Sequence, residues 1–241
     1  MKLSIIIPCY NESQNIPLLL DRFEKNLKRE DVEIIIVENG STDDSAGVLE
    51  ELAPNYSFLK TVFVEENKGY GFGILSGLEQ AGGEFLGWTH ADLQTDPCDV
   101  LKALEIIESR DNAVNLFVKG ARRGRSAFDN LFTIGMSVFE SVYLGVSLWD
   151  INAQPNVFHR SFFSGWKNPP HDFSLDLYAF FMAKKRGLAI VRIPVLFPRR
   201  QHGSSKWNTG LLSKLKFIKR TVDFSVGLKH DIKHGIHSAQ D

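Results

Sequence analysis

Short apolar runs that alternate with helical patterns constrain this chain most strongly. The first run, Leu3–Ile7, is almost entirely apolar, which is typical of a strand buried on both faces of a sheet. After it, Asn15–Leu27 carries apolar residues at helical spacing. Further strand-like runs are Glu33–Val37, Thr61–Val64, Phe85–Thr89 and Val114–Lys119, and further helical patterns end at Leu52 or cover Gly69–Gln80 and Asp99–Ser109. Strands that alternate with helices predict an α/β fold.

The second half of the chain has a less regular pattern. Asn130–Trp149 is weakly charged and its apolar residues share one helical face, which predicts a helix packed in the core. Glu140 in its middle argues against a membrane span, because a carboxylate at a bilayer centre costs roughly 2.5–3.5 kcal/mol. The other elements expected are a loop at Asn152–His159, a helix at Leu175–Arg186, a strand at Ala189–Leu196, a polar loop at Pro198–Asn208 and a helix from Leu211 to about His234.

No repeat, low-complexity tract or linker divides the sequence. Its 241 residues suit one large domain. We therefore predict a single domain with two functional halves, residues 1–118 and 119–210, followed by a C-terminal helix and tail at 211–241.

The composition excludes some classes of function. The chain has 28 Lys and Arg against 29 Asp and Glu, a net charge of −1, whereas a general nucleic-acid binder is usually strongly basic. Its two cysteines, Cys9 and Cys98, make no disulfide framework and fit a reducing compartment. The first residues lack the length and the cleavage site of a signal peptide. We therefore expect a cytoplasmic protein without a membrane span that does not bind nucleic acid.

Polar clusters follow three of the predicted strands, at Pro8–Glu12, Glu38–Ser41 and His90–Gln94. Ligands of open α/β sheets bind beyond the carboxyl ends of the strands, so parallel strands would bring the three clusters to one site. The turn PCYNES after the first strand contains no glycine, which argues against a dinucleotide enzyme of the G-x-G-x-x-G type. The glycines of Gly69–Gly77 fit either a phosphate loop or a tight turn with close helix packing.

Five motifs occur in a fixed order: SIIIPCYNES, EIIIVENGSTDDS, NKGYGFG, GWTHADLQTDP and RQHGSSK. Together they resemble glycosyltransferase family 2, most closely its dolichol-phosphate mannose synthase-like and polyprenyl-phosphate sugar transferase branch. The resemblance is clear over about the first 125 residues and resumes at Phe173–Tyr178 and at Arg200–Lys206. It implies a single GT-A domain, a Rossmann-like, mostly parallel sheet flanked by helices. It also implies inverting transfer of a sugar from a nucleoside-diphosphate sugar.

The resemblance assigns the nucleotide-sugar site to the first half of the chain. Glu38 stands where the family more often has an aspartate that contacts the base or ribose, and a carboxylate suits the polar donors of both. The alternative for Glu38 is a solvated loop acid. The residues expected to bind the nucleotide sugar are Pro8, Tyr10, Asn11, Glu12, Glu38, Asn39, Gly40, Lys68, Gly71, Ala91, Arg200 and Lys206.

A divalent ion, Mn²⁺ or Mg²⁺, is expected at the sequence His90-Ala91-Asp92-Leu93-Gln94, which resembles the family's Asp-x-Asp-x-Gln. Asp92 and Gln94 match that pattern, whereas His90 replaces an aspartate and so removes a negative charge. Three alternatives follow. Asp92 binds the metal with His90 only nearby, or His90 coordinates Mn²⁺, which tolerates imidazole better than Mg²⁺ does. In the third, metal is dispensable and cationic side chains cover the diphosphate.

Arg200 and Lys206 lie on a Gly/Ser loop after a strand. A guanidinium fork and a lysine point charge both suit a diphosphate, and the resemblance implies that this loop covers the pyrophosphate as a mobile lid. Arg200 is thereby also a catalytic candidate, together with Asp92. The alternative is an exposed basic loop.

The acceptor site is expected in the second half. Asp176 occupies the position where the branch carries Glu or Asp and is the candidate general base, with Asp172 as the second candidate. Arg122 lies in Gly120-Ala121-Arg122, which resembles the G-S-R that the branch uses for a lipid phosphate. Asp129 and Asn130 depart from the cations usual there, so a glycan hydroxyl competes with a lipid phosphate as the acceptor.

The C-terminal segment is basic: Lys206–Lys233 carries seven Lys or Arg and two Asp. Its apolar residues share a helical face, from Leu211 to Val226. Such a helix can lie on an anionic membrane leaflet, or its apolar face can pack against the domain. A peripheral position on the cytosolic membrane face is therefore one of the two expectations.

The leading hypothesis is an inverting glycosyltransferase of cell-envelope polysaccharide or lipid-linked glycan synthesis. The alternative is a non-catalytic nucleotide-sugar-binding or scaffold protein of the same fold, which His90 and Asp129 favour.

Overall fold

One sheet of seven strands organises the computed structural model, which describes residues 1–124, 127–198 and 211–234. The order across the sheet is β3-β2-β1-β4-β6-β5-β7. The strands are β1 (Leu3–Cys9), β2 (Val32–Asn39), β3 (Leu59–Val64), β4 (Phe85–Trp88), β5 (Leu116–Arg123), β6 (Asn156–His159) and β7 (Ala189–Leu196). β1 pairs in parallel with β2 and β4, β2 with β3, and β5 with β7. The prediction of a single α/β domain with a mostly parallel sheet is confirmed.

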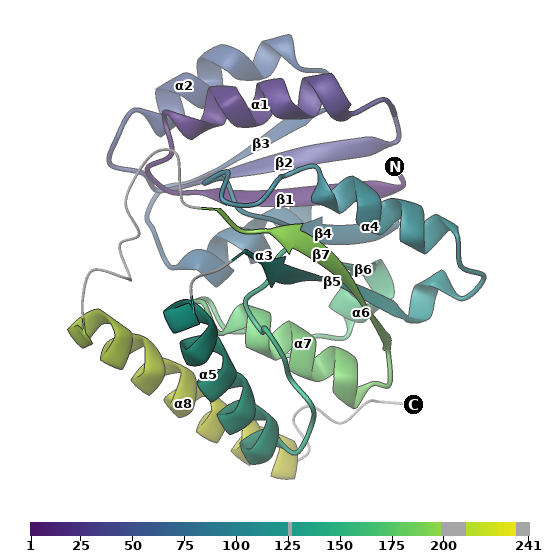
Figure 1. The fold of residues 1–241 in the computed structure, drawn as a ribbon. Coiled ribbons are helices and arrows are strands. Elements are labelled where there is room, and N and C mark those ends of the chain that lie inside the picture. The colour runs from purple at the N-terminus through teal and green to yellow at the C-terminus, as the bar shows by residue number, and fades with distance from the viewer. Residues whose placement is uncertain (125–126, 199–210, 235–241) are drawn as a thin grey trace.

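Helices cover both faces of this sheet (Figure 1). They are α1 (Asn15–Asn26), α2 (Ser45–Leu52), α3 (Tyr70–Gln80), α4 (Asp99–Glu108), α5 (Ala127–Leu144), α6 (Arg160–Ser164), α7 (Leu175–Lys185) and α8 (Leu211–Lys233), with 3₁₀ turns η1 (Ala53–Asn55) and η2 (Ala113–Asn115). Because strand side chains alternate between faces, Ile5 and Ile7 of β1 pack with α1, α2 and α4, whereas Ile6 packs with α3, α6 and α7. The apolar runs at β1, β2 and β4 are therefore strands buried on both faces, whereas β3, at the edge of the sheet, is only partly buried.

Strand β6 is a correction to the sequence analysis, which expected a loop at Asn152–His159. It runs antiparallel to both neighbours, β4 and β5. With only four residues, two of them polar, it is too short for a strand pattern to show. Its direction places its first residue, Asn156, at the edge where the parallel strands end, beside Trp88 of β4 and Lys119 of β5.

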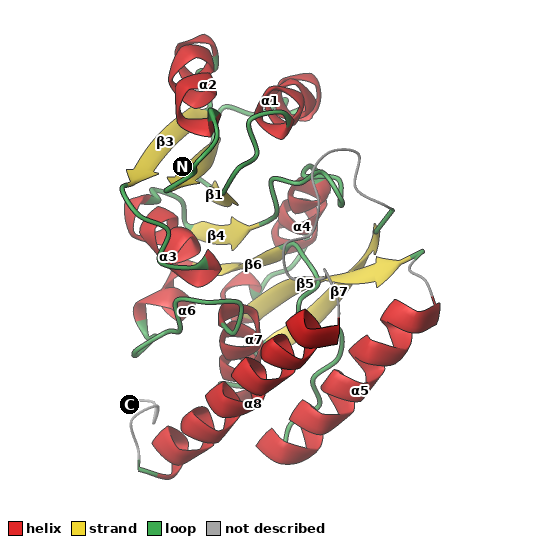
Figure 2. Cartoon of the chain, turned by 90° about the vertical axis from the view of Figure 1, so that its left-hand side faces the viewer, coloured by secondary structure: helices red, strands yellow, loops and turns green. Residues whose placement is uncertain are grey.

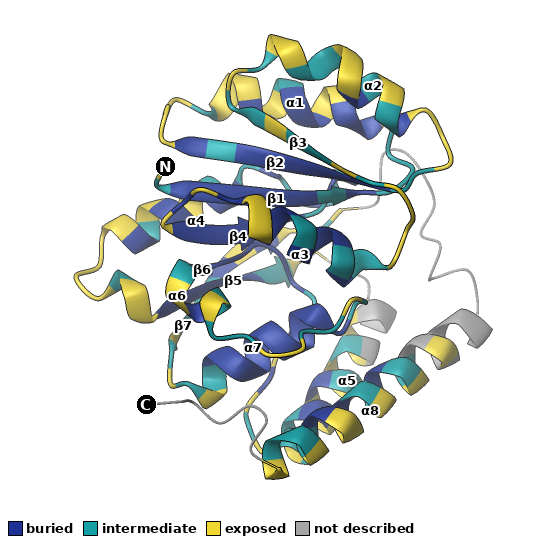
Figure 3. Ribbon diagram, turned by 180° about the vertical axis from the view of Figure 1, so that it is seen from behind, coloured by how far each residue is buried: buried dark blue, intermediate teal, exposed yellow. Residues whose placement is uncertain are grey.

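Helix α5 is a second correction, because the sequence analysis expected a core helix at Asn130–Trp149. It lies beside α8, and the pair projects from the sheet (Figures 1 and 2). Several of its apolar residues are exposed, among them Leu131, Val138 and Val142. Figure 3, coloured by burial, shows α7 mostly buried, in contrast to the α5/α8 pair. Helical periodicity correctly predicted that these residues share a face, but not what that face contacts. Within the described ranges, none of the helices combines the length and hydropathy needed to cross a bilayer.

Candidate functional site

The loops after β1 and β2 are hydrogen-bonded to each other at the carboxyl edge of the sheet. Asn11, with a left-handed φ of 58°, donates its backbone N–H to Ser41 Oγ at 3.0 Å and accepts the Thr42 N–H at 2.8 Å. The Glu12 N–H donates to Ser45 Oγ at 2.9 Å. The first two polar clusters predicted from the sequence are thus brought together.

The Glu38 carboxylate is buried and turned onto its own loop. It accepts the backbone N–H groups of Gly40 at 3.2 Å and of Ser41 at 2.7 Å. Gly40 has a left-handed φ of 68°, and a Cβ there would lie 2.5 Å from Asn67 N. Cys9 pairs with Glu38 across β1 and β2. Burial raises the pKa of its thiol, and the charges of Glu12, Glu38 and Asp43 raise it further. Glu38 therefore shapes this loop, and its contact with a nucleotide stays a prediction.

The glycine-rich turn that begins α3 packs closely against the segment before α7. A Cβ on Gly71 would lie 2.5 Å from Pro170 O, and the Phe72 N–H donates to His171 O at 2.9 Å. The Asn39 amide donates to Gly69 O at 3.0 Å, which joins this turn to β2. These contacts match the tight-turn alternative for the glycines. Lys68 is exposed, with Nζ 5.3 Å from the centre of the Phe72 ring.

The predicted metal residues lie in the loop after β4. Asp92 is buried, and its Oδ1 accepts the Gln94 N–H at 3.0 Å. The Gln94 amide donates to Pro198 O at 3.2 Å. Pro198, which follows β7, therefore lies beside this loop. The His90 ring is 5.8 Å from that of Tyr70. Among the described residues, no three or more His, Cys, Asp or Glu side chains are grouped so that they could coordinate a metal ion.

Asp176 lies in the first turn of α7, fully buried between the two halves of the sheet. Its Oδ1 accepts three N–H donors: Trp88 Nε1 at 3.0 Å, Gln154 Nε2 at 2.8 Å and Asn156 Nδ2 at 3.1 Å. One oxygen of this buried carboxylate thus has three hydrogen-bond donors. Gln154 also donates to the Tyr70 hydroxyl at 3.2 Å.

Tyr70 connects the acceptor candidate to the metal loop. Burial, followed by the charges of Asp176 and Asp92, raises the pKa of its phenol, which places both carboxylates near its ring. On its other side Phe173 stacks on Tyr70 with ring centres 4.6 Å apart. The neighbouring Asp172 is half-exposed and forms an ion pair of 3.2 Å with Arg220 of α8.

Lys119, Gln154 and Asn156 are among the residues of this site that the sequence analysis missed. All three are buried, and the latter two lie in the segment expected to be a loop. The only signal in the sequence is the dense polar string NAQPN, directly before the apolar pair of β6. Burial lowers the pKa of the Lys119 ammonium to about 7.

Arg122, at the end of β5, is paired with a buried carboxylate. Its Nε donates to Asp150 Oδ1 at 2.7 Å, and its backbone N–H donates to Oδ2 at 2.8 Å. Burial alone would raise the pKa of Asp150, but the charge and hydrogen bonds of Arg122 outweigh it and hold that pKa below its usual value. The ion pair thus fixes the Arg122 guanidinium at the end of β5, on the side of the site that the second half of the chain forms.

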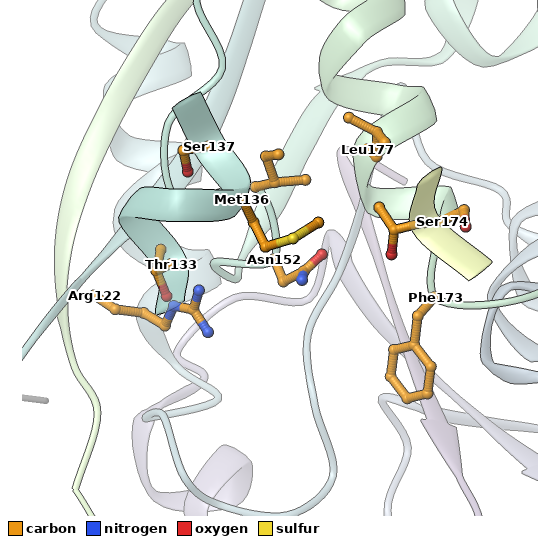
Figure 4. Close-up of a pocket in the computed structure, with 10 residues that line it drawn as sticks. Arg122, Thr133, Met136, Ser137, Asn152, Phe173, Ser174 and Leu177 are labelled. Carbon is orange, nitrogen blue, oxygen red and sulfur yellow. The ribbon is translucent and has the colours of Figure 1, made fainter. Parts of the chain in front are cut away.

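Two hollows adjoin Arg122. One is a cavity of about 40 Å³ in which Arg122 and the side chains of α5 face Phe173, Ser174 and Leu177, with Asn152 between them (Figure 4). The other is an open cleft of about 360 Å³. It is lined by Arg122, Arg123, Gly124, Asn130, Thr133, Ile134, Trp149 and Asp150. The cavity holds only a few water molecules, so the open cleft is the larger space for a ligand.

Several predicted residues cannot be placed in this arrangement. Arg200 and Lys206 lie outside the described residues, and so does the side chain of Asp129. Pro8 and Tyr10 are half-buried at the end of β1, and Ala91 is buried beside Asp92. The roles predicted for all the site residues stay predictions.

The fold and these contacts define a class: a GT-A-type α/β protein whose polar loops gather at the carboxyl edge of its sheet. The match with known sequences is more specific. The chain belongs to glycosyl transferase family 2, whose family model matches residues 4–164.

Similar proteins of known name include undecaprenyl-phosphate 4-deoxy-4-formamido-L-arabinose transferases. That of Pseudomonas fluorescens (strain Pf0-1) is 31% identical over 219 residues, which are 89% of this chain and 62% of the relative. That of Proteus mirabilis (strain HI4320) is 29% identical over 230 residues, 92% of this chain and 66% of the relative. This chain thus spans a little under two thirds of the length of these relatives.

Solved structures share the fold. Glucosyl-3-phosphoglycerate synthase from Mycobacterium tuberculosis, in complex with Mn²⁺, UDP and glucosyl-3-phosphoglycerate, has a TM-score of 0.69 and 16% identity, covering 93% of this chain and 78% of that one. The mannosyltransferase PcManGT from Pyrobaculum calidifontis, in complex with GDP-Man and Mn²⁺, has a TM-score of 0.64 and 19% identity, covering 84% and 58%. At these identities the likeness shows the fold alone.

Proposed function

We propose that this chain is an inverting glycosyltransferase that moves a sugar from a nucleoside-diphosphate sugar to a lipid phosphate at the cytosolic membrane face. The observation that carries the proposal is the buried Asp176, which lies between the donor-side strand β4 and the acceptor-side strand β6. A reaction that joins a donor to an acceptor needs such a group between their two sites. The names of the relatives, which specify undecaprenyl phosphate, support a lipid acceptor.

In this proposal the acceptor oxygen attacks the anomeric carbon as the bond to the nucleoside diphosphate breaks, so the configuration inverts. Asp176 takes the acceptor's proton as the general base. A phosphate monoester has a second pKa of about 6, so near neutral pH it retains little of that proton. Asp176 is thus needed less for a phosphate than for a hydroxyl, and the same site could accept either chemistry at different rates.

On the donor side, we propose that Asp92 binds a divalent ion together with the diphosphate. Mg²⁺ is usually held by one or two carboxylates plus substrate phosphates rather than by a complete protein cage. One buried carboxylate, without a cluster of further ligands among the described residues, fits an ion that arrives with its substrate. When bound, the ion neutralises charge on the leaving diphosphate. The Mn²⁺ in the two related structures supports this assignment.

The open cleft beside Arg122 suits the acceptor. Arg122 and Arg123 offer positive charge at one end, while Ile134 and Trp149 offer apolar surface. A phosphate attached to a hydrocarbon chain combines the same two properties. Because Asp150 already offsets the charge of Arg122, the exposed Arg123 adds positive charge to the cleft.

The helix pair α5 and α8 supports contact with a membrane because its polarity is inverted. Ser137, Glu140, Thr221 and Ser225 are polar and buried in or beside the interface of the pair. Leu131, Val138, Val142 and Val226 are apolar and exposed. Polar contacts inside and apolar side chains outside are typical of helices surrounded by lipid. The exposed Lys216 and Lys219 of α8 add the charge that anionic head groups attract.

The test is a transfer assay with the purified chain. UDP-, GDP- and dTDP-sugars are each offered with a polyprenyl phosphate in vesicles or with a glycan acceptor, in Mn²⁺, in Mg²⁺ or in EDTA. We expect release of nucleoside diphosphate and a lipid-linked sugar with one donor class, and slower transfer in the Asp176→Asn variant, with a larger loss for a glycan hydroxyl than for the lipid phosphate. The absence of turnover with every donor and both acceptors would contradict the proposal.

A further inference from the structure

Lys119 is a fully buried lysine at the centre of the molecule, and it does not itself contact the carboxylate at the site. Its Nζ donates to Ala153 O at 2.9 Å and to Asn156 Oδ1 at 2.7 Å. Its ammonium also lies 5.4 Å from the centre of the Phe180 ring. Both hydrogen-bond acceptors are neutral amide oxygens, so the contacts direct those amides rather than form an ion pair.

With Lys119 as an ammonium, the hydrogen bonds that lead from it to Asp176 allow only one assignment of donors and acceptors. A lysine ammonium donates and cannot accept, so the oxygen of the Asn156 amide must face it. The Asn156 Nδ2 then faces the other way and donates to Gln154 Oε1 at 2.7 Å and to Asp176 Oδ1 at 3.1 Å. Because Gln154 accepts at its oxygen, its own Nε2 is left to donate to Asp176.

A second donor-only group closes the network from the opposite side. The indole N–H of Trp88 can only donate, and it reaches Asp176 Oδ1 at 3.0 Å. Donor-only groups at both ends therefore converge on one carboxylate oxygen. Among the described residues, this leaves Oδ2 of Asp176 for the acceptor.

We propose that Lys119 is a positioning residue, whose ammonium holds the Asn156 amide in the orientation that turns its N–H toward Asp176. This inference rests on the proposed function, in which Asp176 is the general base. Without Lys119 the Asn156 oxygen is buried without a hydrogen-bond donor, which destabilises this position of the amide. A full rotation is unfavourable, because it would set the oxygen against Gln154 Oε1 and the Asp176 carboxylate. The amide instead loses the contact that anchors its oxygen, so Asp176 loses the fixed position of one N–H donor.

Charged groups from several elements surround Lys119: Asp176 of α7, Asp150 before β6, Arg122 of β5 and Arg192 of β7. Burial, the largest cause, and the two arginines lower its pKa, while the two aspartates raise it, and the resulting value is about 7. A neutral lysine amine keeps two N–H groups and can still donate to Asn156. These two N–H groups match the two acceptors, Ala153 O and Asn156 Oδ1, so the neutral amine can keep the same hydrogen bonds, although the amine, with its lone pair, no longer enforces their direction.

The first test compares Lys119→Met with Lys119→Gln in the transfer assay. We expect Lys119→Met to lower kcat about 10- to 100-fold, the loss typical of a misplaced catalytic group, with an unchanged KM for the donor sugar. Lys119→Gln restores an N–H donor without a charge and should recover most of kcat. A wild-type kcat in Lys119→Met, or a Lys119→Gln enzyme no faster than Lys119→Met, would overturn the proposal. Calorimetric binding of the nucleoside diphosphate verifies that both variants fold.

Asn156→Asp is a second variant, which decides the question if Lys119→Met does not fold. It keeps an acceptor for Lys119 but has no N–H for Asp176, and it adds a like charge beside that carboxylate. We expect a similar loss of kcat and a shift of the acid limb of the kcat profile to higher pH by about one unit. An unchanged rate and profile would contradict the role of Asn156 and with it that of Lys119. Failure of the wild-type chain to transfer any sugar would instead contradict the proposed function itself, and this inference with it.

Discussion

The donor-side layer and the α5/α8 helix pair use similar apolar patterns in opposite ways. In β1 and α1, the apolar residues of the sequence pattern, such as Ile5 and Leu19, are fully buried against each other. In α5, Leu131 is 66% exposed and Val142 is 79% exposed. An apolar face is stabilised only by something that covers it. In the donor-side layer that partner is the same domain, whereas these side chains of α5 are exposed in the described structure.

The two regions also differ in where they keep polar groups. In the donor-side layer, polar residues gather at the edge of the sheet, in loops that are hydrogen-bonded to one another. In the helix pair, Glu140 and Ser225 lie buried in the interface, where Ser225 Oγ donates to Glu140 Oε2 at 2.5 Å. Asp176 lies between the regions, with hydrogen bonds to both halves of the sheet. Variants in each region should therefore affect different measurements.

The largest effect is expected at Asp176, which lies between the two regions. Asp176→Asn should lower kcat by about 10³-fold with a hydroxyl acceptor, because an amide cannot take the proton that the hydroxyl loses, and by less with a phosphate acceptor, which is already largely ionised. Donor binding, measured by calorimetry, should remain at the wild-type level, since the donor-side loops are untouched. The matched control is Asp172→Asn, at a half-exposed acid on the same segment, with an expected loss of less than about 3-fold. Equal losses in the two variants would mean that Asp176 is not the base.

The next largest effect is expected at Asp92, on the donor side. Asp92→Asn should lower kcat/KM by about 10²-fold and make the remaining rate insensitive to Mn²⁺, because the ion loses its only buried carboxylate in this loop. Binding to vesicles should not change. If Mn²⁺ still stimulates the variant as strongly as the wild type, the ion is held by other groups, and His90 becomes the first residue to test.

A smaller effect is expected for the helix pair. Val142→Asp should weaken binding to anionic vesicles about 10-fold, from the loss of one buried valine side chain in the membrane interface. The midpoint of unfolding should not change, because this side chain is exposed in the folded chain. The control is Val114→Asp, at a valine 46% exposed on η2. Equal binding by both variants, in a flotation assay, would show that α5 does not face the lipid.

The fold was predictable where local pattern and burial agree. Strands β1, β2 and β4 are apolar runs because both their faces are covered, so their sequence pattern reports directly on structure. Strand β6 was not predictable in this way, since four residues carry almost no period. The exposure of α5 was not predictable either, because amphipathicity indicates a shared face but not the partner of that face.

The candidate site was predictable at residues that stand in motifs. Asp92, Asp176 and Arg122 were named from the sequence, and the structure places all three around one edge of the sheet, although their roles remain predictions. Lys119 was missed because a lysine in a strand gives no sign that its ammonium is buried. Its importance depends on hydrogen bonds to Asn156, 37 positions away, which only the folded chain brings within reach.

The smallest expected effect concerns the buried acid of the helix pair. Burial raises the pKa of Glu140, although the hydrogen bond from Ser225 opposes the shift. A raised pKa in the folded state means that the protonated acid stabilises the fold at low pH, and that this stability is lost as pH rises through the folded-state pKa. Glu140→Gln keeps an acceptor for Ser225 but does not ionise. It should therefore raise Tm by about 2 °C at pH 8 and leave it unchanged at pH 4. Thermal unfolding at the two pH values measures this difference. A variant that is destabilised at pH 8 would show that the charged carboxylate holds the two helices together, and the polar interface would then be an attractive contact rather than a tolerated one.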